Sequence, residues 1–308
     1  MTQTATTTDL CPGLDGPSLQ RMDGGFVHAF HAMGSPCEVW IDSEDEDLAA
    51  VLGAIAEHEA LRIEARYSRY RPDSIVSRIN ASHGEVVHLD DETANLIDYA
   101  ARCFDLSEGR FDITSGILRS IWRFDGSDRV PARESIRALK SRIGWRKVTW
   151  RRPDLTLPRG MEIDLGGLGK EYAVDCAVGK LRSAGTTPVL VNFGGDLRVS
   201  GPRRDGRGWR AAIESVDVPG GREGVIEISS GALATSGDAR RFLLKDGVRY
   251  SHILDPRRAA PVKDPPRSVT VAAATCVEAG FLSTLAMLHG AQAEAFLARE
   301  ELTAWWLR

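Results

Sequence analysis

Residues 161–184 combine a carboxylate, a glycine-rich loop and an ammonium group in a spacing that suits an anion. Asp164 ends an apolar stretch, and Lys170 opens a helical pattern after the three glycines Gly166, Gly167 and Gly169. Glycine amides can approach phosphate oxygens, and the helix N-terminus and the Lys170 ammonium both favour negative charge. The loop is no Walker loop, because Glu171 stands where Ser or Thr is needed. Phosphate binding is one hypothesis, and a turn that only redirects the chain is the alternative.

Four further clusters of polar residues follow strand-like segments downstream. They are NFGGD at 192–196, TSGD at 235–238, SHILDP at 251–256 and ATCVEAGFLST at 274–284. Glycine lets the backbone approach a pyrophosphate, and carboxylate and hydroxyl oxygens are ligands that Mg²⁺ prefers. Taken singly, each cluster could be turn chemistry, because Asp and Asn beside Gly are ordinary turn formers. As a set they predict a nucleotide-phosphate and metal site at strand ends.

The elements expected to position these clusters are helices and short strands in separate groups. Apolar residues at three- and four-residue steps predict helices over residues 48–61, 92–106, 132–143 and 170–184, and a last one from 276. Strand patterns cover residues 26–41, 147–150, 188–193, 197–200, 209–214, 225–229, 232–235, 241–244, 248–254 and 269–274. Asp246-Gly247 predicts a hairpin. This grouping favours an α+β fold with mixed or antiparallel sheets over a strict βαβ repeat.

Domain organisation follows from the distribution of polar and apolar residues. Residues 1–24 are polar and punctuated by Gly and Pro, which predicts a flexible N-terminal tail. Residues 25–308 contain no internal repeat and no linker, and they predict a single domain.

The composition is that of an ordinary soluble globular protein, with 43% hydrophobic and 27% charged residues. A net charge of −4 offers no basic surface for nucleic acid. No segment approaches the ~20 apolar residues of a membrane helix, and the first residues lack the pattern of a secretory signal. The five cysteines are odd in number and form no CxxC pair. These features predict a reduced, cytoplasmic protein without a membrane span.

The order of the motifs adds a resemblance to a known family. From Phe26 onward they are AMGSPCEVW, YSRYRPDSIVSRIN, GRFDITSG, IDLGGLGKEYAVD, VNFGGD, ATSGD, YSHILDP and SVTVAAATCVEAGFLSTLAML. Together they resemble the ApbE family, the FAD:protein FMN transferases. Proteins of that family bind FAD and, with Mg²⁺, move its FMN half onto a Ser or Thr hydroxyl of a target protein, releasing AMP. The resemblance implies the same fold, substrate, metal and kind of protein partner here.

The resemblance also implies the site residues. The expected flavin-nucleotide contacts are Met33, Tyr70, Arg110, Phe111, Asp112, Asp164, Lys170, Asn192, Gly194, Gly195, Asp196, Ser236 and Ile253. The expected metal ligands are the Gly167 carbonyl and the hydroxyls of Ser283 and Thr284. The expected catalytic residues are Lys170, His252 and Asp255. Core packing is the alternative for the apolar and aromatic members of the first set, and a helix cap or turn is the alternative for Asp164.

His252 suits a role as base, because an imidazole with a pKa near ~6.5 can accept a hydroxyl proton at neutral pH. A structural histidine that bonds a nearby backbone group is the alternative.

One position departs from the family pattern. The family reads Glu-Ala-Asp where this chain has Glu278-Ala279-Gly280, so Gly280 supplies no carboxylate. Because positions 280 and 284 share a helix face, Gly280→Asp is expected to strengthen a weakened Mg²⁺ site. Glycine inside a helix also costs about 1 kcal/mol relative to alanine. A close approach of another backbone or of the ligand would explain it, and drift after loss of metal dependence is the alternative. Two functions remain beside the transferase: an FAD-binding protein with a weakened metal site, and an FAD pyrophosphatase that yields FMN and AMP.

Overall fold

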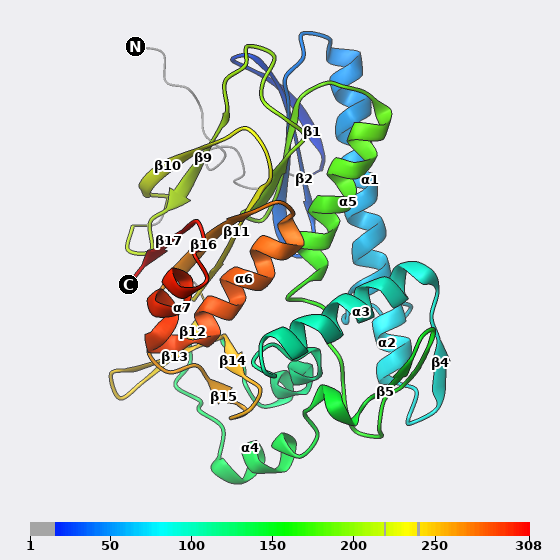
Figure 1. Ribbon diagram of the computed structural model, residues 1–308, viewed down its shortest axis with the longest axis vertical. Coiled ribbons are helices and arrows are strands. Elements are labelled where there is room, and N and C mark those ends of the chain that lie inside the picture. Colours follow the sequence, from blue (N-terminus) through cyan, green and yellow to red (C-terminus); the bar gives the residue numbers. More distant parts are fainter. Residues whose placement is uncertain (1–15, 219, 239–240) are drawn as a thin grey trace.

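The structure is a computed structural model that describes residues 16–218, 220–238 and 241–308 (Figure 1). An eight-stranded sheet in the order β1-β2-β3-β7-β8-β11-β16-β17 forms its centre. Neighbouring strands of this sheet pair antiparallel, and helices pack against it. The predicted α+β class is confirmed.

The strands of the central sheet are β1 (Ser18–Met22), β2 (Gly25–Ala32), β3 (Ser35–Ile41), β7 (Val189–Phe193), β8 (Asp196–Val199), β11 (Ala232–Gly237), β16 (Ser268–Ala273) and β17 (Ala304–Leu307). Smaller sheets contain β4 (Val86–His88), β5 (Thr149–Arg151) and β6 (Asp154–Thr156), then β9 (Trp209–Glu214) with β10 (Arg222–Ile228), β12 (Phe242–Lys245) with β13 (Val248–Ser251), and β14 (Leu254–Asp255) with β15 (Ala260–Pro261). The predicted hairpin at Asp246-Gly247 is confirmed between β12 and β13.

The α-helices are α1 (Glu46–Tyr67), α2 (Ile75–Asn80), α3 (Asp91–Leu106), α4 (Arg133–Lys140), α5 (Gly169–Ala184), α6 (Cys276–Leu288) and α7 (Ala293–Arg299). Short 3₁₀ helices cover Ile113–Ser120, Trp145–Lys147 and Gly290–Gln292. Of the helices described, none is long and apolar enough to cross a membrane.

One end of the central sheet carries two tight hairpin turns. Met33 and Gly34 link β2 to β3, Gly194 and Gly195 link β7 to β8, and φ is positive at all four residues. Two-residue hairpins of this kind use left-handed backbone at both positions, which glycine adopts without strain. The Gly194 amide donates to the Pro36 carbonyl at 2.9 Å. The two turns therefore lie next to each other at the same end of the sheet.

Three helices cover one face of the sheet (Figure 1): α1 packs on β2 and β3, α5 on β7 and β8, and α6 on β11 and β16. Helix α5 begins at the end of the sheet that carries the two turns, and the chain returns to that end along β7. The N-terminus of α5 therefore lies beside the turn that follows β7. The β9–β10 hairpin covers apolar residues on the other face. That second core comprises Leu190, Leu197, Val199, Trp209, Ala211, Ile228 and Leu233.

A carboxylate on α5 fixes the start of α6. Asp175 accepts hydrogen bonds from the backbone amides of Cys276 and Val277 at 2.9 and 3.0 Å. It also pairs with Arg198 of β8 at 2.7 Å. The first amides of a helix have no partner within the helix, so Asp175 satisfies two of them and holds α6 against α5.

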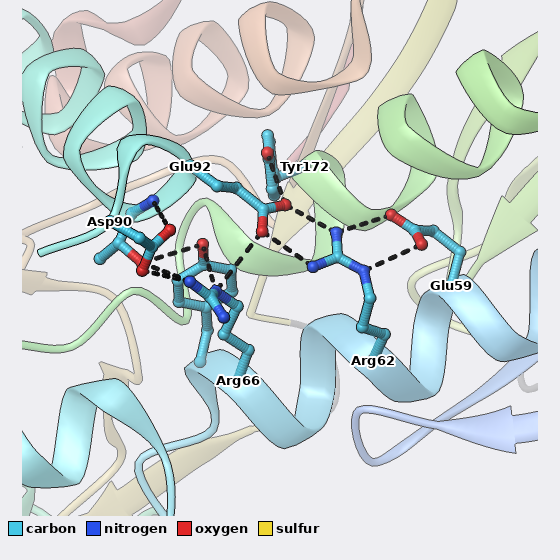
Figure 2. A network of polar contacts seen from close by, with 8 residues as sticks. Glu59, Arg62, Arg66, Asp90, Glu92 and Tyr172 are labelled. Atoms are coloured by element: carbon cyan, nitrogen blue, oxygen red, sulfur yellow. Dashed lines mark hydrogen bonds and ion pairs between the residues drawn. The ribbon is translucent and has the colours of Figure 1, made fainter.

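A network of ion pairs holds the same helix α5 to α1 and α3 (Figure 2). Figure 2 shows the guanidinium of Arg62 between Glu59 and Glu92, and its N–H groups donate to both carboxylates at 2.6–3.0 Å. Glu92 also accepts from the Tyr172 hydroxyl on α5 at 3.0 Å. Arg66 adds a second cation 3.4 Å from Glu92. The ion pairs thus join α1 to α3, and the Tyr172 hydroxyl attaches α5 to the same network.

The N-terminal part differs from the expectation of a tail over residues 1–24. Residues 1–15 lie outside the described residues, but Ser18–Met22 forms β1 and pairs with β2 from Ser18↔Ala29 to Met22↔Gly25. Leu19 packs against the main core. The strand is added to the sheet edge mainly by backbone hydrogen bonds, a signal that side-chain composition does not carry.

Candidate functional site

Lys170 and Asp196 form an ion pair between the start of α5 and the turn after β7. Asp196 is 2% exposed and accepts from the Thr235 amide at 3.1 Å. The Lys170 ammonium also lies 3.5 Å from the Gly194 carbonyl. Burial by itself lowers the pKa of Lys170, but the carboxylates of Asp196 and Glu171 outweigh it and hold the pKa above its ordinary value. The structure thus brings three predicted contacts together around one permanent positive charge.

Asp164, at the entry to the glycine loop, is held by two arginines. Arg69 and Arg119 donate to its Oδ2 at 3.2 and 2.9 Å, and the Gly166 amide donates to its Oδ1 at 3.0 Å. The hydrogen bond from the Gly166 amide is the one expected if Asp164 is a turn carboxylate, which was the alternative to a ligand contact. Neither arginine was predicted as a site residue; Arg69 lies in the quoted motif YSRYRPDS, whereas no sequence signal singled out Arg119.

Tyr70 lies over Arg119, whose guanidinium carbon is 5.0 Å from the ring centroid and which also donates to the tyrosine hydroxyl. Tyr70 is 78% exposed, so core packing does not explain it. An exposed aromatic ring held by a cation offers a face on which a planar ring system can stack.

Phe111 lies between the glycine loop and α6. Its ring is 5.6 Å from that of Phe281, edge to face, and it lies 3.5 Å from where a Cβ of Gly167 would be. Phe111 is buried, which agrees with the alternative that it packs in the core. The contact nevertheless brings Gly167, which is exposed, to the side of α6 that carries Phe281.

The two neighbours of Phe111 have different surroundings. The buried Asp112 carboxylate accepts from the Thr114 amide and hydroxyl at 2.8 and 2.6 Å and from the Trp145 amide at 3.0 Å. These bonds give Asp112 a structural role as a helix cap. Arg110 is half-buried, and burial together with the nearby Arg257 lowers its pKa.

Three hydroxyl groups meet where β11 ends against α6. Ser236 Oγ lies 2.9 Å from Ser283 Oγ and 2.9 Å from Thr284 Oγ1. The Ser283 hydroxyl donates to the Gly280 carbonyl at 3.0 Å. Ser283 and Thr284, predicted as metal ligands, are thus joined by Ser236, which was predicted as a nucleotide contact.

Gly280 lies directly against the side chain of Glu171. A Cβ at position 280 would be 2.6 Å from Glu171 Cγ, 2.9 Å from Oε1 and 3.0 Å from Cδ. An aspartate at position 280 would therefore require the Glu171 side chain to shift. The group that approaches Gly280 is the Glu171 side chain, and not another backbone or a ligand as expected.

Glu171 is 8% exposed and its Oε2 has no hydrogen-bond partner. Burial, followed by the neighbouring Asp196, raises the pKa of Glu171 to about 7. In the sequence, Glu171 stands out only because it replaces the Ser or Thr of a Walker loop. The glycine at position 280 was the signal that something approaches, but nothing in the sequence named the partner.

The hydroxyl groups and the unpartnered Glu171 oxygen fit a hard divalent cation, which prefers oxygen ligands. Within the described residues no group of three or more His, Cys, Asp or Glu side chains could hold a metal. A cation here would therefore draw on hydroxyl and carbonyl oxygens beside a single carboxylate, a set that Mg²⁺ accepts when substrate phosphates complete it.

His252 and Asp255 lie on the segment between β13 and β15. His252 Nδ1 is 3.1 Å from the Arg241 carbonyl, and burial lowers its pKa. Asp255 accepts from the Arg257 amide at 2.9 Å and pairs with the guanidinium of the same residue at 3.1 Å. Asp255 therefore stabilises the turn between β14 and β15. Ile253, between them, is half-buried and packs against the main core.

The remaining predicted contacts belong to the two adjacent turns. Met33 is half-buried against the main core. The Asn192 side chain accepts from the Gly195 amide at 2.9 Å and so shapes the turn next to Lys170. Turn formation accounts for Asn192, as expected for Asn beside Gly.

Comparison with known proteins identifies the family of this chain. The family model described as the ApbE family matches residues 33–306. The chain belongs to the ApbE family. Among the ApbE relatives is an FAD:protein FMN transferase of Vibrio cholerae, 36% identical over 236 residues, which are 74% of this chain and 70% of the relative. The protein of the same description from Escherichia coli K12 is 29% identical over 247 residues, 76% of this chain and 70% of that one.

Solved ApbE structures share the fold over nearly the whole chain. An ApbE protein from Thermotoga maritima has a TM-score of 0.82 at 30% identity and covers 92% of this chain and 94% of its own. The apo flavinyl transferase ApbE of Pseudomonas stutzeri has a TM-score of 0.81 at 29% identity, with 96% and 93% covered.

Proposed function

We infer that this chain is an FAD:protein FMN transferase, the activity by which its Vibrio cholerae and Escherichia coli relatives are described. The observation that carries this inference is the Lys170–Asp196 pair beside the glycine loop, within a chain that matches the family over residues 33–306. A fixed cation, glycine amides and a helix N-terminus together suit the pyrophosphate of FAD.

In the proposed reaction, the hydroxyl oxygen of an acceptor Ser or Thr attacks the phosphorus of the FMN half of FAD. A new oxygen–phosphorus ester bond forms, the bond from this phosphorus to the bridging oxygen breaks, and AMP leaves with that oxygen. The Lys170 ammonium neutralises charge on the pyrophosphate. Most of the rate enhancement then comes from positioning and charge neutralisation, as in other phosphoryl transfers.

Mg²⁺ is proposed to be held by the Gly167 carbonyl and the hydroxyls of Ser283 and Thr284. When bound, such an ion supplies further positive charge to the phosphate oxygens. The unpartnered Glu171 oxygen and the three clustered hydroxyls support this assignment.

His252 is proposed to accept the proton of the acceptor hydroxyl. The Arg241 carbonyl can only accept a hydrogen bond, so the Nδ1 at 3.1 Å from it carries the hydrogen. Nε2 then keeps a free lone pair. Because burial lowers the pKa of His252, the ring is neutral at pH 7 and able to act as a base.

The test is incubation with FAD and MgCl₂ and a set of Thr- and Ser-centred peptides, with Ala-centred peptides as controls. A transferase adds the mass of FMN to a hydroxyl peptide and releases one AMP for each peptide modified. AMP and free FMN without a modified peptide would indicate the pyrophosphatase instead. FAD binding without any AMP would indicate a binding protein.

His252→Ala is expected to lower FMN transfer by on the order of 10²-fold, because a positioned base contributes about that factor. FAD affinity, measured by flavin fluorescence, is expected to stay unchanged. His252→Gln is the control, since its amide can keep the bond to the Arg241 carbonyl without acting as a base. Normal transfer by His252→Ala, or loss of FAD binding, would rule out the proposed role.

A further inference from the structure

Glu171 occupies the space in which residue 280 would project a side chain. Glycine at position 280 leaves that space open, and three atoms of the Glu171 side chain lie within 2.6–3.0 Å of where a Cβ would be. Glu171 belongs to the first turn of α5, so the carboxylate reaches this place from the opposite helix.

The Glu171 carboxylate is buried without a matching charge of its own. Its Oε2 has no partner, and the nearest cation, Lys170, already pairs with Asp196. The other nearby carboxylate, Asp175, is used by Arg198 and by the amides at the start of α6. Because buried polar atoms are nearly always satisfied, an unpaired carboxylate oxygen at this place indicates a ligand.

The helix face that Glu171 touches also carries hydroxyl oxygens. Positions 280 and 284 are one helical turn apart and point to the same side of α6. The Thr284 hydroxyl on that face contacts Ser236, which contacts Ser283 in turn. A carboxylate beside several hydroxyls is a suitable ligand set for a divalent cation whose remaining positions are filled by phosphate or water.

We propose that Glu171 supplies the carboxylate of a divalent-cation site between α5 and α6, in place of the side chain that Gly280 lacks. The inference rests on the proposed function, which calls for Mg²⁺ at this place. It means that the departure from the family pattern at position 280 moves the acidic ligand from α6 to α5 and leaves the site intact.

The experiment measures Mg²⁺ binding directly, by calorimetry on the FAD-bound full chain without any acceptor. Glu171→Gln keeps the shape of the side chain and removes its charge, and it is expected to weaken Mg²⁺ binding at least tenfold. Glu278→Gln is the matched control, because Glu278 is an exposed carboxylate on the same helix, and it is expected to change the affinity less than twofold. FAD affinity in EDTA is expected to be equal in all three proteins.

The double variant Glu171→Gly with Gly280→Asp returns the carboxylate to α6. It is expected to restore Mg²⁺ affinity to within a few-fold of wild type, whereas Gly280→Asp alone unfolds at a lower temperature because its Cβ meets Glu171. Circular dichroism establishes that each variant is folded, and Glu171→Met replaces Glu171→Gln if the latter does not fold.

Three results would overturn the proposal: wild-type protein that binds no Mg²⁺ with FAD present, a Glu171→Gln variant that binds it as wild type does, or a folded double variant no better than Glu171→Gln. Its failure is distinguishable from that of the proposed function. Transfer by wild type with unchanged Mg²⁺ binding in Glu171→Gln refutes only the role of Glu171. Mg²⁺ binding through Glu171 without any FMN transfer refutes only the transferase.

Discussion

Two neighbouring residues of α5, Glu171 and Tyr172, lie in two regions that treat a carboxylate differently. Tyr172 faces the network of Figure 2, where Arg62 is bonded to both Glu59 and Glu92. Glu171, one residue earlier, faces α6 with an unpartnered oxygen. The hydrogen bonds from Arg62 lower the pKa of Glu92, whereas burial raises that of Glu171. The carboxylates that stabilise the fold, Glu59 and Glu92, have partners within the protein. The Glu171 carboxylate, which we propose binds a cation, has an oxygen without a partner.

Removing the cation of the matched region is expected to have the largest effect. Arg62→Met leaves Glu59, whose side chain is 4% exposed, and Glu92 without their main partner. Breaking a buried ion pair costs about 3–5 kcal/mol, and partial exposure of Arg62 reduces the expected loss of unfolding free energy to about 2 kcal/mol. Urea unfolding measures it.

Arg71→Ala is the matched control for Arg62→Met. Its pair with Asp73 is exposed on both sides, and such surface pairs contribute about 0–1 kcal/mol. If both variants lose the same free energy of unfolding, the buried ion pairs of Arg62 stabilise the protein no more than an exposed pair does. FAD affinity is expected to be unchanged in both.

Glu38 sharpens the comparison, because its partners are neutral. Trp40 Nε1 donates to its carboxylate at 3.1 Å, and burial raises its pKa from the ordinary 4.5 to about 7. Between these two values the folded state binds more protons than the unfolded state, so stability falls as pH rises from about 4.5 to 7. Glu38→Gln is expected to remove this fall and to be about 1–2 kcal/mol more stable than wild type at pH 8.

Urea unfolding of wild type and Glu38→Gln at pH 4.5 and pH 8 measures this difference. The two proteins are expected to differ little at pH 4.5, where the carboxyl group is largely protonated. A difference that is the same at both pH values would show that the substitution acts through packing and not through charge.

The smallest expected effect concerns the ion pair beside the glycine loop. Lys170→Met is expected to weaken FAD binding about tenfold, or about 1.4 kcal/mol, and riboflavin binding less than twofold, because riboflavin has no phosphate. Isothermal titration with both ligands tests this. Lys170→Met combined with Asp196→Asn removes both charges and controls for the unpaired buried Asp196. Equal losses for FAD and riboflavin would show that Lys170 does not recognise phosphate.

Much of the framework of the candidate site was predictable, because it depends on local patterns. Strand periodicity and the glycine pair located the end of β7, strand periodicity located the start of β11 but ended it at 235 instead of Gly237, and helical periodicity located α5 and α6. Those elements bring Lys170 to Asp196 and join Ser236 to Ser283 and Thr284. Each of these contacts joins the end of a strand to a residue of a helix that packs on the same sheet.

The other contacts depend on side chains that meet only in the folded chain. Helical periodicity places Glu171 in the first turn of α5 but cannot tell that Gly280 leaves room for it. Arg119 reaches Asp164 from a 3₁₀ helix that was not predicted from the sequence. Asp112 and Asp255, expected to act on ligands, are occupied by bonds to Trp145 and Arg257 that the sequence does not reveal.

Met33 adopts a left-handed backbone conformation that costs a residue other than glycine about 1 kcal/mol or more. Asn or Gly would form the same turn without that strain. The packing of the Met33 side chain against the core offsets the strain in part. Methionine is unbranched and adapts its shape to its neighbours. The turn beside the glycine pair therefore combines a strained backbone with an apolar side chain that can adjust its shape to its neighbours.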